Sequence, residues 1–221
     1  MKRFLISICL ISLCLFPEAV FAQKQIQIVT TTSDLRSIAE FIGGDKAAVL
    51  SLSGGLQDPH FVDPKPSYML KVRGADLFIR NGLELEAGWE SLIIEGSRNP
   101  KIKVGSSGHL DASKGIQPLE IPETVDRSMG DIHPSGNPHY WLDPLNAGII
   151  AANITGRLSE LSPAQTAYYE RNLAEFNQKL DQKMAEWSGA LAPLRGEKII
   201  MEMGGGHPRG APALGWRIRC L

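Results

Sequence analysis

The sequence is poor in cysteine and has no long apolar run beyond its first residues. Three of its 221 residues are cysteines, at Cys9, Cys14 and Cys220. The first two lie in an N-terminal segment with the features of a signal peptide, and one remaining cysteine cannot form an internal disulfide. No later stretch reaches the roughly 20 apolar residues of a transmembrane helix. These absences exclude a disulfide scaffold and a later membrane span.

The chain also has no excess of charge of one sign. Its 23 Lys and Arg residues nearly balance 24 Asp and Glu residues, for a formal net charge of −1. Nucleic-acid-binding domains usually carry a basic excess, so we expect no nucleic-acid partner. The sequence has no phosphate-binding glycine loop, no G-x-S-x-G and no H-E-x-x-H motif, so none of these motifs indicates an enzyme.

Residues 1–22 have the order of a secretory signal peptide. Two cations precede an apolar run of about 13 residues, and Val20-Phe21-Ala22 forms a small-residue cleavage site. The run is too short for a membrane anchor. Leu13 is too large for the usual lipoprotein site before Cys14. We therefore expect a soluble exported protein, cleaved after Ala22.

The middle of the chain alternates short β-branched segments with amphipathic ones. The pattern predicts helices over 33–42, capped by Ser33 or Asp34, and over 66–73 and 85–95, with strands over 25–31, 47–52, 76–80 and 101–104. Strand and helix in alternation favour an α/β fold with a parallel sheet and flanking helices. Residues 105–138 are rich in Gly, Pro, Ser and Asp and are predicted to form a loop.

Two further helices are predicted after this loop. Asp143 caps one that begins at Pro144, and Ser162-Pro163-Ala164-Gln165 is a capping box for a second that ends near residue 188. The second would be a rod of about 38 Å, long enough to connect two lobes.

The C-terminal end breaks the pattern. Residues 197–201 predict the first strand of a new unit, but residues 204–221 have no period of two or 3.6. We expect a truncated or frame-shifted second lobe, and a flexible tail is the alternative. The expected organisation is a signal peptide (1–22), an N-terminal α/β lobe (23–160), a long linking helix (161–190) and the start of an incomplete C-terminal lobe (191–221).

One short motif occurs twice. Asp58-Pro59-His60-Phe61-Val62-Asp63-Pro64 is echoed by Asn137-Pro138-His139-Tyr140-Trp141-Leu142-Asp143-Pro144, with one extra residue in the second copy. In each copy a proline restrains the backbone before a histidine. Neutral imidazoles on stiff loops are good ligands for zinc-like ions. The alternative is two unrelated loop histidines, packed or solvated.

These motifs resemble the solute-binding proteins of ABC transporters that import zinc or manganese. The matching pieces are GLQDPHFVDPKPSYMLKVRGADLFIRNGLELEAGWESLI (55–93) and GDIHPSGNPHYWLDPLNA (130–147), with the helix 162–188 and the strand 197–200 in the same order. The resemblance implies two α/β lobes, a metal ion between them and delivery to a membrane permease. His60 and His139 align with the two histidine ligands of the family's N-terminal lobe. We expect a monomer that binds Zn²⁺ or Mn²⁺, with no cofactor and no catalysis.

In the resembling family, two further metal ligands come from the C-terminal lobe, and this sequence has no matching residues at those positions. The third, His or Glu, should follow the strand 197–200, where Met201-Glu202-Met203 stands; Glu202 and the later His207 are possible substitutes. The fourth, an acid, has no counterpart. His133 could support a metal ligand, capture the ion as a ligand itself, or be a solvated loop residue, and His109 is expected to be exposed.

Residues 111–136 lack the long His-rich insertion of many zinc-specific members, so the choice between zinc and manganese stays open. Two alternatives to metal capture remain at this stage. One is a non-functional fragment of such a protein. The other is a secreted zinc hydrolase, which would need three ligands, an open water position and a carboxylate base.

Overall fold

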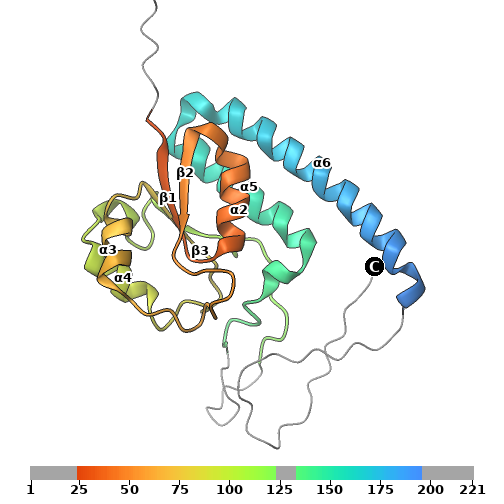
Figure 1. Ribbon diagram of the computed structural model, residues 1–221, viewed down its shortest axis with the longest axis horizontal. Coiled ribbons are helices and arrows are strands. Elements are labelled where there is room, and N and C mark those ends of the chain that lie inside the picture. Colours follow the sequence, from red (N-terminus) through yellow and green to blue (C-terminus); the bar gives the residue numbers. More distant parts are fainter. Residues whose placement is uncertain (1–23, 123–132, 196–221) are drawn as a thin grey trace, which may run out of the picture.

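The computed structural model describes residues 24–122 and 133–195, which form an α/β unit with one long helix along its side (Figure 1). The sheet has four parallel strands in the order β2-β1-β3-β4. The strands are β1 (Ile26–Thr30), β2 (Ala47–Ser51), β3 (Leu77–Arg80) and β4 (His109–Asp111). The helices are α2 (Ser33–Gly43), α3 (Pro66–Arg73), α4 (Glu90–Ser97), α5 (Pro144–Leu161) and α6 (Thr166–Leu191).

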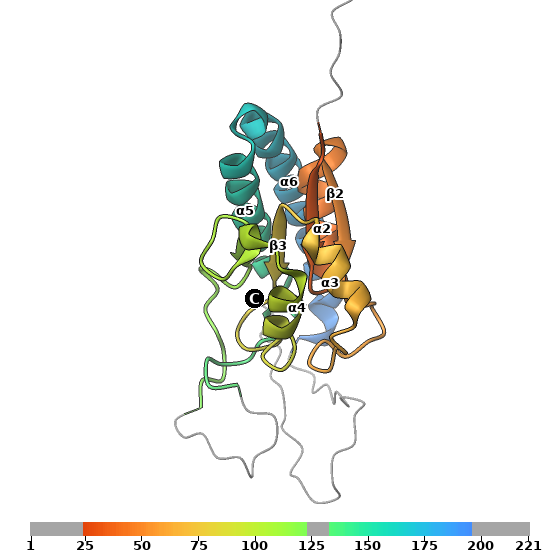
Figure 2. The ribbon, with the colours of Figure 1, turned by 90° about the vertical axis from the view of Figure 1, so that its left-hand side faces the viewer.

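Alternating side chains of the central strands bury both faces of the sheet. Leu77 and Ile79 of β3 point into a core shared with α2, α5 and the start of α6. Phe78, between them, points into a second core shared with α3 and α4. Figure 1 shows α3 and α4 on one side of the strands and α2 and α6 on the other, and Figure 2 views the unit from the side of α3 and α4. The period of two therefore places one helical layer on each face.

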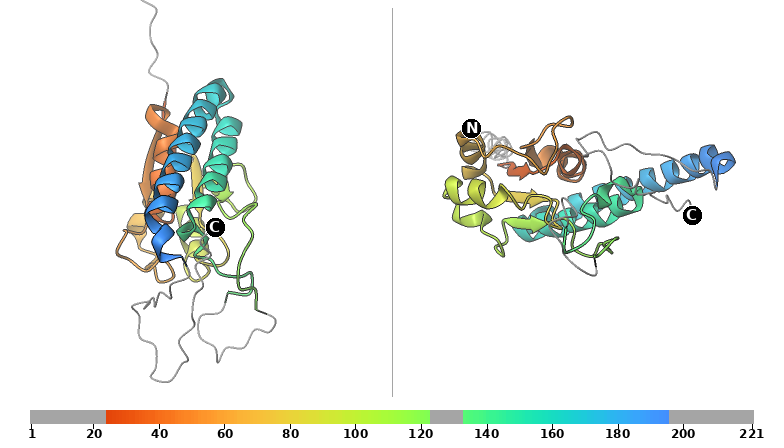
Figure 3. Two further views of the ribbon diagram at one scale, coloured as in Figure 1. Left: turned by 90° about the vertical axis from the view of Figure 1, so that its right-hand side faces the viewer. Right: turned by 90° about the horizontal axis from the view of Figure 1, so that it is seen from below.

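The long helix α6 packs on the unit mainly through its first half. Tyr169 is fully buried, Asn172 donates a hydrogen bond to the Ile42 carbonyl at 2.9 Å, and Phe176 packs edge-on against Phe41. Trp187 and Leu191, nearer its end, are 42% and 49% exposed. Figure 3 shows α6 beside α5 and extending past it. None of the helices in the described ranges is long and apolar enough to cross a membrane.

The predicted α/β fold is confirmed, but the fourth strand was misplaced. Residues 101–104 are not a strand, because the Asn99 side chain accepts a hydrogen bond from the Lys101 N–H and closes a 3₁₀ turn over Pro100–Ile102. The fourth strand is β4, inside the segment predicted to be a loop. It pairs with β3, Phe78 opposite His109. A three-residue strand after a Gly-rich turn carries too little periodicity to be recognised.

Helix starts were predicted with mixed success. Asp143 caps α5 as predicted, through the Leu145 N–H at 3.0 Å. The cap of α2 is Thr32, one residue before the predicted Ser33 or Asp34. The Ser162 side chain does not cap α6, because a 3₁₀ turn over Pro163–Gln165 comes first. The helix predicted from residue 85 begins only at Glu90.

The predicted signal peptide (1–22) lies outside the described residues. So does nearly all of the predicted start of a C-terminal lobe (191–221), including Glu202 and His207.

Candidate metal centre

The two histidine motifs have the same hydrogen-bond geometry. The backbone N–H and ring Nδ1 of His60 both donate to Asp58 Oδ1, each at 2.9 Å. The backbone N–H and ring Nδ1 of His139 donate to Asn137 Oδ1 at 2.9 and 3.0 Å. The Asn137 amide nitrogen donates to Glu120, which orients its oxygen towards the histidine. With the proton on Nδ1, each Nε2 keeps the lone pair that can bind a metal ion.

Each histidine loop is also held at the proline that precedes the histidine. The indole N–H of Trp89 donates to the Pro59 carbonyl, and the Asn81 amide donates to the Pro138 carbonyl, both at 2.9 Å. Trp89 is 2% exposed and Asn81 fully buried. The segment 81–89 after β3 is therefore a common anchor for both loops.

A buried carboxylate fixes that anchor segment. Glu86 accepts hydrogen bonds from the Thr31 hydroxyl (2.6 Å) and from the backbone N–H groups of Asn81 (2.7 Å) and Gly82 (3.1 Å). Burial raises the pKa of Glu86, and these hydrogen bonds counteract the rise. The turn that Glu86 closes has positive φ at Leu83 (48°) and Glu84 (67°), a backbone form that non-glycine residues rarely adopt. Such strained turns cluster at functional sites.

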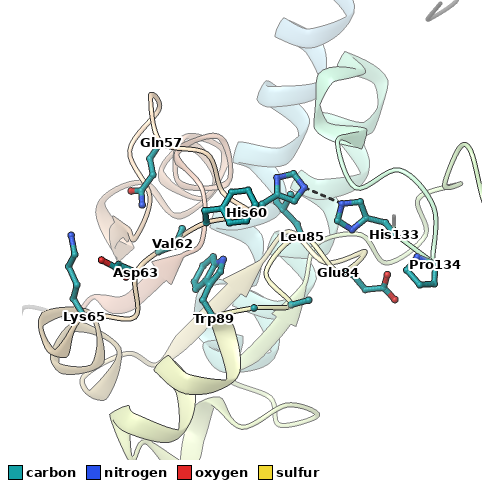
Figure 4. A pocket seen from close by; sticks show the side chains of 13 residues that line it. Gln57, His60, Val62, Asp63, Lys65, Glu84, Leu85, Trp89, His133 and Pro134 are labelled. Carbon is teal, nitrogen blue, oxygen red and sulfur yellow. Dashed lines mark hydrogen bonds between the residues drawn. The ribbon is translucent and has the colours of Figure 1, made fainter. Parts of the chain in front are cut away.

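Three imidazoles meet above this segment. The Nε2 atoms of His60 and His133 are 3.1 Å apart (Figure 4), and the ring centres of His60 and His139 are 5.1 Å apart. The sequence motif predicted His60 and His139, and the structure brings them together. For His133 the sequence left open a supporting residue, a capture ligand or a solvated residue, and the structure places it in direct contact with His60.

His109 is not exposed, contrary to the prediction. It lies in β4 with 7% exposure, and its Nε2 is 2.8 Å from Glu90, which also pairs with Arg80. Its burial follows from the misplaced fourth strand, because a strand residue facing α4 has no access to solvent. His109 is thus part of a structural ion-pair network.

A cavity of about 790 Å³ opens beside the histidines. Its lining includes His60, His133, Glu84, Trp89, Asp63 and Lys65, and Figure 4 shows the His60 and His133 rings facing each other at its edge. His139 is not among the lining residues. In the side-chain positions observed within residues 24–122 and 133–195, no three or more His, Cys, Asp or Glu residues are placed so that they could hold one metal ion together.

Burial keeps His139 neutral. Burial, together with the nearby rings of His60 and His133, lowers the pKa of His139 to about 4. Burial would raise the pKa of Asp58, but the hydrogen bonds from His60 outweigh it and hold the pKa below its usual value. A neutral His139 beside an ionised Asp58 suits the binding of a cation.

The metal-free protein should lose stability as the pH falls from about 6.5 towards 4. In that window the unfolded chain takes up a proton on His139 that the folded protein, with a pKa of about 4, does not. Urea unfolding followed at pH 7, 6, 5 and 4 measures the slope. His139→Gln, which does not titrate, should reduce it, and an equal slope in the variant would contradict this origin.

Comparisons with known proteins identify the family to which this chain is similar. Residues 28–204 match the family model described as ZnuA: Zinc-uptake complex component A periplasmic. The manganese ABC transporter substrate-binding lipoprotein PsaA of Streptococcus pneumoniae is 32% identical over 180 residues, covering 81% of this chain and 56% of the relative. PsaA of Streptococcus mitis is 30% identical over 187 residues, covering 83% and 57%.

Solved structures match the fold. A ZnuA deletion mutant with zinc bound superposes with a TM-score of 0.65 and 29% identity, covering 77% of this chain and 60% of that one. The Mn-bound periplasmic metal binding protein of Candidatus Liberibacter asiaticus gives 0.63 and 25%, covering 76% and 58%. This chain spans little more than half the length of the curated relatives.

The residues that sequence reasoning missed are the anchors. Asn81 was not singled out, and Glu86 and Trp89 were noted only as residues near a helix start. All three are buried beside a turn with positive φ angles. Burial and backbone strain are properties of the tertiary structure, so no local sequence pattern pointed to these residues. The fold, the paired histidine loops and a family match that extends over most of the chain lead to one conclusion: this chain belongs to the family of periplasmic A components of zinc-uptake complexes.

Proposed function

We propose that this chain is the extracytoplasmic solute-binding component of an ABC importer. It captures a divalent transition metal as cargo, with zinc first and manganese second, and delivers the ion to a membrane permease. It performs no catalysis and acts as a monomer in the periplasm after cleavage following Ala22. Supporting this, the family match describes a zinc-uptake component, and the relatives named above are manganese transport proteins.

The observation that carries the proposal is the shared geometry of the two histidine loops. His60 and His139 each donate Nδ1–H to a side-chain oxygen two residues earlier, so each presents an Nε2 lone pair. Hydrogen-bond acceptors at Nδ1 are typical of histidines that bind metals. Imidazole nitrogen favours zinc over manganese, which prefers oxygen ligands. We therefore assign His60 and His139 as ligands.

The proposal includes the domain organisation. Residues 23–160 form the metal-binding lobe, residues 161–190 link it to a second lobe, and residues 191–221 begin that lobe. The exposed apolar end of α6, with Trp187 and Leu191, fits a helix that continues towards another unit. A secreted hydrolase is not supported, since the sequence has no H-E-x-x-H motif, which would place a carboxylate base beside two zinc ligands.

Isothermal titration of residues 23–221 with Zn²⁺ and then Mn²⁺ tests the proposal. We expect stoichiometric zinc binding that is lost in His60→Ala/His139→Ala. The matched control is Leu56→Ala/Gln117→Ala, which changes one exposed residue on the His60 loop and one on the segment after β4, and should bind as the parent does. Thermal unfolding curves establish that both variants are folded. Equal zinc affinity in the histidine variant would refute the ligand assignment, and no binding by the parent would indicate a non-functional fragment.

A further inference from the structure

A third histidine lies against the proposed ligands. His133 comes from the loop before His139, and its Nε2 is 3.1 Å from Nε2 of His60, 73 residues away in sequence. Figure 4 shows the two rings edge to edge over the cavity. His133 is partly buried, and its loop is tied down where the Ser135 hydroxyl donates to Glu84 at 3.0 Å. The contact is thus held on the His60 side by the hydrogen bond to Asp58 and on the His133 side by the hydrogen bond from Ser135 to Glu84.

The contact between His60 and His133 places a proton where a metal ion would lie between two ligand nitrogens. His60 uses its Nδ1–H for Asp58, so its Nε2 offers a lone pair towards His133. Two imidazole nitrogens this close share one proton between them. A tetrahedral zinc ion with bonds near 2.1 Å holds two nitrogens about 3.4 Å apart. Zinc could replace the shared proton if the two nitrogens separated by a few tenths of an ångström.

The third ring is at a comparable distance. The ring centre of His60 is 5.1 Å from that of His133 and 5.1 Å from that of His139. Two imidazoles bound to one tetrahedral ion have ring centres about 5 Å apart. His60 is therefore correctly spaced from both neighbours. The three rings do not yet converge on one point, so metal binding requires His133 or His139 to turn towards the other two.

We infer that His133 is the third ligand of the metal, giving a three-nitrogen site built entirely within the described unit, with the fourth position open to water. This inference rests on the proposed function, because it adds a ligand to the same site. Three imidazoles and a water are a known zinc arrangement, and a third nitrogen favours zinc further over manganese. The chain would then bind zinc without a ligand from residues 196–221.

The test is zinc affinity of the full exported chain, measured against a competing chelator. His133→Gln keeps a hydrogen-bond donor for His60 but is a poor zinc ligand, and we expect it to weaken binding by about tenfold or more. His133→Asp supplies a carboxylate ligand and should retain most of the affinity. Gln117→Ala, which changes an exposed residue on the segment after β4, is the control and should leave the affinity unchanged. Visible absorption of the Co²⁺-loaded protein reports the ligand set independently of affinity.

The outcomes separate the two proposals. Weaker binding in His133→Gln, rescue in His133→Asp and an altered cobalt spectrum support the third ligand. Unchanged or tighter binding in His133→Gln, alongside loss in His60→Ala/His139→Ala, overturns this inference and leaves the proposed function intact. Binding that survives in His60→Ala/His139→Ala overturns both.

Discussion

Replacing Glu86 with alanine should lower the free energy of unfolding by about 3–5 kcal/mol. The substitution removes the Glu86 acceptor from three buried donors: the Thr31 hydroxyl and the N–H groups of Asn81 and Gly82. The Asn81 N–H keeps only its longer hydrogen bond to the Thr31 hydroxyl oxygen, at 3.2 Å. Each orphaned buried donor costs about 1–3 kcal/mol, and partial entry of water offsets part of the sum. The loss falls on the turn that carries both histidine loops, so zinc affinity should decrease as well.

Urea unfolding monitored by tryptophan fluorescence and circular dichroism measures this effect. Glu95→Ala is the matched control, because Glu95 is an exposed glutamate nearby on α4 and its side chain should contribute less than about 0.5 kcal/mol. Glu86→Gln should fall between the two, since its amide retains one accepting oxygen and turns an NH₂ group towards a donor. A loss below about 1 kcal/mol in Glu86→Ala would show that Glu86 does not hold the turn.

Removing the donor that anchors either histidine loop should weaken zinc binding by about 10- to 100-fold. Trp89→Phe keeps the buried aromatic ring but deletes the N–H that binds the Pro59 carbonyl. Asn81→Ala deletes the amide that binds the Pro138 carbonyl. In both variants the loop behind the histidine is released, and the two Nε2 atoms lose their fixed separation. Each variant should also lose about 1–3 kcal/mol of stability.

A matched control separates positioning from general destabilisation. Asn99 is also a buried asparagine, and its amide donates to the Val72 and Ala75 carbonyls at 3.0 and 2.8 Å, between α3 and α4. Asn99→Ala should cost similar stability and leave the zinc affinity of the folded protein unchanged. Titration at a temperature where all three variants are folded makes the comparison. An equal loss of affinity in Asn99→Ala would mean that Asn81 and Trp89 act only through stability.

The local signals in the sequence were sufficient for most of the elements. Prolines and an Asx cap marked the start of α5, and β-branched runs marked β1 and β2. The repeated Asx-Pro-His motif identified His60 and His139, because proline and the residue before it fix the loop backbone locally. Where local signals were weak or competing, as at β4 and before α4, the prediction failed.

The sequence by itself determined the parallel α/β fold and the two histidine loops, because both are encoded in residues close together along the chain. Only the tertiary structure decided which loops and side chains come into contact. The parallel strands end at one edge of the sheet, so the loop after β2 and the segment 81–89 after β3 come together there. That arrangement puts His133 against His60, buries His109 and directs Trp89 and Asn81 to the two prolines. These contacts join residues far apart in sequence, and no spacing along the chain encodes them.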